Sequence, residues 1–165
     1  MTYMNHVAHV RVAAWARRAI LPGSLAPMRL SRDIVDDLVA HAREDAPNEC
    51  CGIIAAENGR AVRLFRATNA EASPVRYSLD PREQYAITME IEEHGWELGA
   101  IYHSHTRSPA YPSQTDVNLA FYPDALYVIV SVQDLDRPDV RAFRIVEGRI
   151  EPIELEIDGP GDSAS

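Results

Sequence analysis

Three segments of the chain carry the signals of amphipathic helices. In the first, apolar residues recur three and four positions apart after Ser31, a residue type that often caps a helix N-terminus. In the second, Asp80 and Pro81 mark the start and Gly95 marks the end. The pattern therefore predicts three helices, at residues 32–45, 81–94 and 112–122.

Short apolar runs between these segments predict strands. The run 50–56 is followed by Asn58-Gly59, a pair typical of a tight hairpin turn, and 61–69 then alternates between apolar and polar residues. Further strands are expected at residues 97–105, 125–132, 139–147 and 149–157. Hairpins interrupted by helices predict an α/β fold, with a mixed, mainly antiparallel β-sheet flanked by helices.

Length and charge limit the kinds of partner. The 165 residues can form one domain with a substantial core. Every basic residue is an arginine, and 16 of them against 25 acids give a net charge of -9, which argues against a nucleic-acid partner. No apolar stretch approaches the ~20 residues of a membrane helix, so no membrane partner is expected. We expect a domain over 28–157, an extension at 1–27 that is disordered or precedes the true start, and a disordered tail at 158–165.

The two cysteines of the chain, Cys50 and Cys51, are adjacent. Neighbouring residues rarely meet the geometry of a disulfide, so we expect free thiols buried in the core. Free thiols fit a protein of the reducing cytoplasm. A redox pair of vicinal thiols is the alternative.

The end of the strand 97–105 carries candidate metal ligands. His103 and His105 are two residues apart, so both imidazoles point to the same face of a strand. Asp116 follows in the first turn of the next helix and adds a carboxylate. Two histidines and one carboxylate are the three protein ligands of a catalytic zinc site. The alternatives are a polar strand end for the histidines and, for Ser113 and Asp116, a capping box without chemistry.

Hydrolysis by zinc also needs a group that takes a proton from water. Glu49 stands where the Pro47-Asn48 turn enters the first strand, a position that can emerge beside the ends of other strands. It is the best candidate for a general base. The alternative is an ordinary exposed glutamate.

The full pattern, a glutamate followed by H-S-H, seven residues and S-x-x-D, resembles the motif of the JAMM (MPN+) metallopeptidases. The resemblance covers about 28–157 and implies an αβ sandwich. It also implies that His103, His105 and Asp116 are zinc ligands. Glu49 would be the general acid/base, and Ser113 would donate a hydrogen bond to the oxyanion. Most members of the family have a proline after the second histidine, where this chain has Thr106.

Within that family, three stretches are most similar to the actinobacterial Mec branch of sulfur-carrier hydrolases. They are "YHSHT" with the following "AYPS", "NAE-x-SP-x-x-Y-x-L" (69–79) and "E-x-CG" (49–52). The similarity implies hydrolysis of the bond between the Gly-Gly end of a small ubiquitin-like sulfur-carrier protein and a C-terminal cysteine. Tyr102, Arg107 and Tyr111 flank the ligands and are candidates to contact the carrier tail or the cysteine. An isopeptidase or processing protease for another ubiquitin-like protein and a non-catalytic carrier-binding scaffold are the alternatives.

Overall fold

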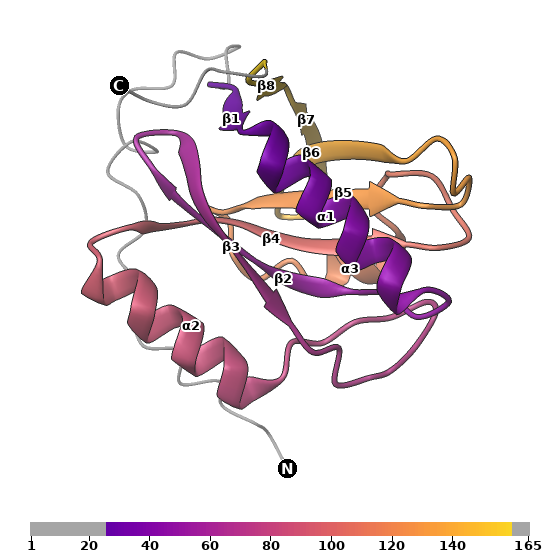
Figure 1. Ribbon diagram of the computed structural model, residues 1–165. Coiled ribbons are helices and arrows are strands. Elements are labelled where there is room, and N and C mark those ends of the chain that lie inside the picture. The colour runs from indigo at the N-terminus through magenta and orange to yellow at the C-terminus, as the bar shows by residue number, and fades with distance from the viewer. Residues whose placement is uncertain (1–25, 160–165) are drawn as a thin grey trace.

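The computed structural model describes residues 26–159 and contains one sheet with three helices (Figure 1). The strands are β1 (Met28–Leu30), β2 (Cys51–Glu57), β3 (Arg60–Ala67), β4 (Glu97–His105), β5 (Leu126–Ser131), β6 (Asp139–Val146), β7 (Arg149–Ile153) and β8 (Leu155–Ile157). The helices are α1 (Arg32–Asp45), α2 (Pro81–Glu93) and α3 (Gln114–Asn118). Most of the expected N-terminal extension and C-terminal tail lies outside the described residues.

The sheet is mixed and mostly antiparallel, as predicted. Its strand order is β7-β6-β5-β4-β2-β3-β1-β8. Four neighbouring pairs run antiparallel, and the pairs β4–β5, β1–β3 and β1–β8 run parallel. Strands β2, β4 and β5 form the buried centre, because nearly all of their residues are buried.

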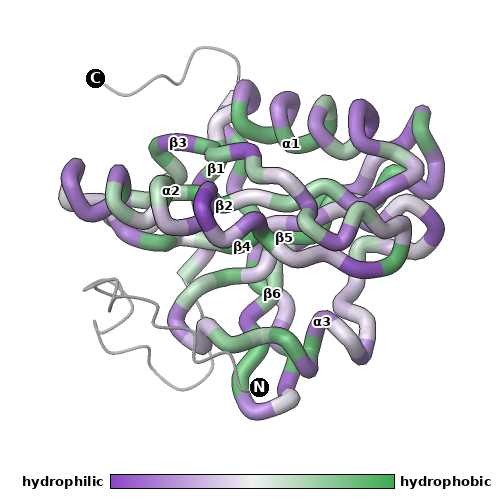
Figure 2. The backbone as a smooth tube through the Cα atoms, turned by 90° about the horizontal axis from the view of Figure 1, so that it is seen from below, coloured by the Kyte–Doolittle hydropathy of each residue, from purple (hydrophilic) through white to green (hydrophobic). Residues whose placement is uncertain are grey.

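Helices cover both faces of the sheet. Val35, Leu38 and Ala42 of α1 pack in one cluster with Ala100 and Tyr102 of β4. On the other face, the apolar residues of α2 pack against the odd-numbered residues of β2, starting with Cys51. Figure 2 shows α1 and α3 on opposite sides of the sheet. None of the helices within residues 26–159 is long and apolar enough to cross a bilayer.

Two features of the sheet differ from the sequence prediction. Strand β1 was not predicted, since a strand of three residues is too short to show alternation. The single strand expected over 149–157 is two strands, separated by Glu154, that pair at opposite ends of the strand order. The main-chain N–H of Met28 donates to the carbonyl of Glu154 at 3.1 Å. The sheet is therefore curled so that its two ends meet at a seam formed by β1, β7 and β8 (Figure 1).

Candidate metal centre

The last residues of β4 bring two imidazoles together. His103 and His105 point to the same face of the sheet, and their Nε2 atoms lie 3.1 Å apart. Both side chains are buried, because this strand lies in the centre of the sheet between β2 and β5. The pairing of two histidines that the sequence predicted is therefore present, at the end of β4 that faces α3.

Asp116 reaches the same point from α3. Its Oδ1 lies 3.2 Å from Nε2 of His103, and its Oδ2 lies 3.1 Å from Nε2 of His105. The helix begins with a capping box, in which the N–H of Ser113 donates to Oδ2 of Asp116 at 2.8 Å. The carboxylate of Asp116 thus both takes part in the helix cap and lies beside the two imidazoles. A capping box and a metal ligand, the two interpretations of the S-x-x-D pattern, therefore do not exclude each other.

The three side chains fit a zinc ion. Their ligand atoms all lie within 4.8 Å of one another. Two nitrogens bound to a tetrahedral zinc at 2.0–2.1 Å are about 3.3 Å apart, close to the separation found between the imidazoles. Nδ1 of His105 donates to the carbonyl of Pro109 at 2.8 Å, which leaves the lone pair of Nε2 facing the group. Burial raises the pKa of Asp116, but its contacts with the two imidazoles and the hydrogen bond from the N–H of Ser113 dominate and hold its pKa well below the usual range.

Glu49 faces this group from the neighbouring strand. Cys51 pairs with His103 in the antiparallel register of β2 and β4, so extending the register by two residues places Glu49 opposite His105. The side chain is buried, and its Oε2 has no hydrogen-bond partner among the described residues. Burial raises the pKa of Glu49 to about 7; His105 opposes this shift and the carboxylate of Asp116 adds to it. A carboxyl group with such a pKa can both accept and release a proton near neutrality.

Ser113 is exposed at the edge of the site. Its Oγ accepts the main-chain N–H of Asp116 at 3.1 Å, so its hydroxyl hydrogen remains to be donated to another group. Thr106 stands where most JAMM proteins have proline, and its hydroxyl donates to the carbonyl of Pro47 at 3.0 Å. The loop that follows the histidines is thereby tied to the turn that precedes Glu49.

Tyr77 belongs to the site and was not singled out from the sequence. Its ring stacks on the imidazole of His103, with centroids 4.3 Å apart and an interplanar angle of 16°. Nδ1 of His103 has no hydrogen-bond partner within residues 26–159, so packing against Tyr77 and the contact of Nε2 with Asp116 together set the orientation of this ring. The only sequence signal was its place in the 69–79 stretch, and nothing in that stretch indicates which residue it contacts.

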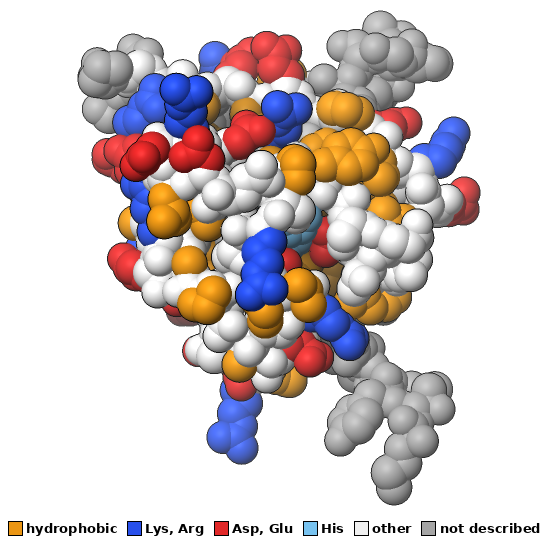
Figure 3. Space-filling model, turned by 90° about the vertical axis from the view of Figure 1, so that its right-hand side faces the viewer, with side chains coloured by type: hydrophobic (Ala, Val, Ile, Leu, Met, Phe, Trp, Pro, Cys, Tyr) orange, Lys and Arg blue, Asp and Glu red, His pale blue; other side chains and the backbone are white. Residues whose placement is uncertain are grey.

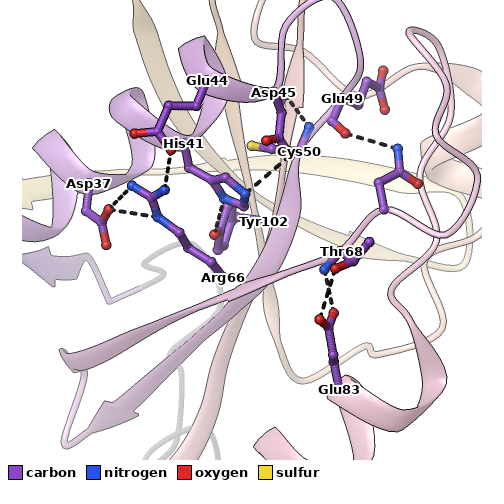
Figure 4. Close-up of polar contacts among 12 residues, drawn as sticks. Asp37, His41, Glu44, Asp45, Glu49, Cys50, Arg66, Thr68, Glu83 and Tyr102 are labelled. Atoms are coloured by element: carbon purple, nitrogen blue, oxygen red, sulfur yellow. Dashed lines mark hydrogen bonds and ion pairs between the residues drawn. The ribbon is translucent and has the colours of Figure 1, made fainter.

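The prediction that Tyr102 contacts substrate is wrong. The residue is fully buried on the opposite face of the sheet, because neighbours on a strand point to opposite sides. Its hydroxyl is 2.8 Å from Nδ1 of His41 on α1. Figure 4 shows this pair, with the carboxylate of Glu49 pointing away from it. Nε2 of His41 faces Asp45 at 3.4 Å and carries the hydrogen, so Nδ1 accepts from the tyrosine hydroxyl.

The other two candidate contact residues are on the surface. Arg107 is exposed in the loop after β4. Tyr111 is 55% exposed, and its ring meets that of Phe143 edge to face, with centroids 5.5 Å apart. Figure 3 faces this end of the strands and shows histidine and acidic atoms at the base of a hollow. Both side chains are exposed, and their contact with a ligand stays a prediction.

The two cysteines are free and buried, as expected. Burial raises the pKa of each thiol to about 12, so neither is a thiolate at neutral pH. The N–H of Cys50 donates to Oγ of Ser104 at 2.8 Å, which holds the start of β2 to β4. The structure therefore assigns both residues to the core rather than to a redox pair.

The curled sheet, its helices and the His-His-Asp group define this chain as an α/β domain of the JAB/MPN type. Residues 31–146 match the family described as prokaryotic homologs of the JAB domain, and the chain belongs to that family. The predicted fold class and the resemblance to JAMM proteins are confirmed.

Known relatives agree with this assignment. The CysO-cysteine peptidase of Mycobacterium tuberculosis is 44% identical over 137 residues, which cover 81% of this chain and 94% of the relative. The desampylase of Haloferax volcanii is 38% identical over 111 residues, which cover 63% and 80%. Among solved structures, a protein from Desulfitobacterium hafniense has a TM-score of 0.73 at 31% identity, covering 79% of this chain and 92% of that one.

Proposed function

We propose that this chain is a zinc-dependent peptidase that cuts the peptide bond between a small ubiquitin-like sulfur-carrier protein and a C-terminal cysteine. The proposal is carried by the two histidines and the aspartate, whose ligand atoms lie within 4.8 Å of one another, and by the carboxyl group of Glu49 opposite His105, whose Oε2 has no partner among the described residues. The relative named CysO-cysteine peptidase, at 44% identity, supports the choice of substrate.

The proposed metal ligands are Nε2 of His103, Nε2 of His105 and the carboxylate of Asp116. A zinc ion held by these residues would supply a Lewis acid that lowers the pKa of water in the site and polarises the carbonyl oxygen of the scissile bond. Glu49 accepts the proton of the attacking water and delivers it to the amine nitrogen of the leaving cysteine. The hydroxyl of Ser113 donates a hydrogen bond to the oxygen that becomes negative when water adds to the carbonyl carbon.

The products follow from this sequence of steps. Breaking the C–N bond leaves the carrier with a free Gly-Gly carboxylate and releases cysteine. Arg107 and Tyr111 are exposed beside the ligands, and we assign them to contact with the cysteine or with the carrier tail. The free, buried thiols support a reducing compartment, the cytoplasm.

A second candidate function is cleavage of an isopeptide bond to another ubiquitin-like protein. The relative named desampylase, at 38% identity, favours this alternative. A third, a scaffold that binds the carrier without cleaving it, is disfavoured because the complete set of ligands and Glu49 is present.

The test combines metal content with cleavage of a defined carrier. Purified protein is expected to hold about one zinc per chain, and His103→Ala is expected to lose it. Incubation with a carrier that ends in Gly-Gly-Cys should shorten the carrier by one cysteine in the mass spectrum. Glu49→Gln should abolish this change and keep the metal. Release from a lysine-linked conjugate but not from the cysteine-tailed carrier would favour the isopeptidase, and carrier binding with neither metal nor turnover would favour the scaffold.

A further inference from the structure

One buried asparagine shapes the loop between β3 and α2. The side chain of Asn69 is buried, and its Nδ2 donates to the carbonyls of Glu49 and Arg76 at 3.0 and 2.9 Å. Its Oδ1 accepts the N–H groups of Glu71 and Ser78 at 3.0 and 3.1 Å. A side-chain amide offers two donor hydrogens and two acceptor lone pairs, so every one of them is used. Three of the four bonds lie within the loop, and the fourth connects the loop to the carbonyl of Glu49.

The same loop also bonds to the other main-chain polar group of Glu49, its N–H. The N–H of Glu49 donates to the carbonyl of Ser73 at 2.9 Å. The backbone of the next residue, Cys50, bonds to β4 instead of the loop, since its N–H and its carbonyl both bond to Ser104. The backbone of Glu49 is therefore held between the loop on one side and the strand of the histidines on the other.

The carboxylate of Glu49 has little else to hold it. Its Oε2 has no partner among the described residues, so its place is set by the backbone that carries it and by packing. The loop that Asn69 folds also carries Tyr77, whose ring stacks on His103. A single loop thus sets the backbone of the proposed base and the packing of a proposed metal ligand.

We propose that Asn69 is a positioning residue for the reaction, which holds the carboxylate of Glu49 at a fixed place relative to the His-His-Asp group. This inference rests on the proposed role of Glu49 as general base. Asn69 does not touch the reacting atoms; it acts through the main chain of Glu49 and through the loop that it folds.

The test variant is Asn69→Asp, which keeps the shape and the acceptor oxygen but replaces the two donated hydrogens by an oxygen that repels the carbonyls of Glu49 and Arg76. We expect zinc content and KM for the cysteine-tailed carrier to stay within twofold of wild type, and kcat to fall about 10- to 100-fold, because a misplacement of about 1 Å can cost that much. Asn58→Asp, the same change at an exposed hairpin turn, should leave kcat unchanged. Ile153→Ala, which destabilises the core far from the loop, should lower the unfolding temperature and also leave kcat unchanged well below that temperature.

A measurement without substrate separates this proposal from the proposed function. In Asn69→Asp, hydrogen exchange at the amide of Glu49, which bonds to the loop, should accelerate on the order of tenfold, while that of Cys50, which bonds to β4, stays slow. If the wild type releases no cysteine, the proposed function fails and the exchange rates still decide the role of Asn69. If the wild type releases cysteine and Asn69→Asp keeps its kcat, or loses activity only through KM, the positioning role is wrong. Should Asn69→Asp fail to fold, Asn69→Ser, which removes the amide without adding charge, is judged by the same criteria.

Discussion

Replacing Tyr102 by phenylalanine should destabilise the fold and leave the chemistry intact. The hydroxyl of Tyr102 is the hydrogen-bond donor to Nδ1 of His41, and both side chains are buried between α1 and the sheet. Losing the donor leaves a buried nitrogen unpaired, which costs about 1–3 kcal/mol. For a chain of this length, a loss of about 2 kcal/mol lowers the unfolding temperature by about 4–8 °C.

Urea unfolding and the carrier-cleavage assay together test this expectation. Tyr102→Phe should shift the urea midpoint to lower concentration, with kcat and KM unchanged at a temperature where the protein is folded. Tyr85→Phe removes the same hydroxyl from a tyrosine that is 65% exposed and should change neither quantity. A raised KM for Tyr102→Phe with unchanged stability would refute the assignment of Tyr102 to the core and return it to the substrate site.

Three further predictions concern the same core and the metal. Gly52→Ala should lower the free energy of unfolding in urea by about 1–3 kcal/mol. An added Cβ would lie 2.2 Å from the carbonyl oxygen of Phe65 and 2.4 Å from the ring of Tyr102. A variant as stable as wild type would contradict this clash. Burial lowers the pKa of His41 in the folded state, although the charge of Asp45 opposes this shift. As the pH falls below about 6.5, the imidazole is therefore protonated in the unfolded state before it is protonated in the folded state, and the free energy of unfolding decreases. His41→Gln should lose less stability than wild type between about pH 7.5 and 5.5, roughly one unit either side of the pKa of an unperturbed histidine. Equal losses in both proteins would exclude His41 as the source of the pH dependence. Chelation of zinc should lower the unfolding temperature of wild type but not of His103→Ala, since a ligand that binds only the folded state stabilises it; an equal shift in both would place the metal elsewhere.

Local geometry predicted one part of the ligand group, and the family resemblance implied the rest. Residues two apart on a strand share a face, so His103 and His105 could be paired without knowing the fold. Asp116 alone could have been a helix cap, and only the resemblance to the JAMM motif added it to the ligands. The same rule, applied to Tyr102, would have put it on the other face. Its position next to a ligand in the sequence suggested a contact that the alternation of the strand forbids.

The parts that the sequence did not predict depend on contacts between distant segments. Tyr77 stacks on His103, and Asn69 bonds to the carbonyl of Glu49, 20 residues earlier in the chain. Neither contact follows from periodicity, because the loop that makes them has no regular structure of its own. The seam between β1, β7 and β8 was missed for a related reason, since its short strands gain their partners only when the sheet curls.

That seam affects how far the domain can be shortened. The family match spans 31–146, whereas β1 ends at Leu30 and β7 begins at Arg149, so a chain trimmed to the matched residues loses all three strands of the seam. Strands β3 and β6 would then become the ends of the sheet, with main-chain N–H and C=O groups left unpaired along one side of each. Exposed strand edges of this kind pair with other chains, so such a fragment is expected to aggregate even though it contains every proposed ligand.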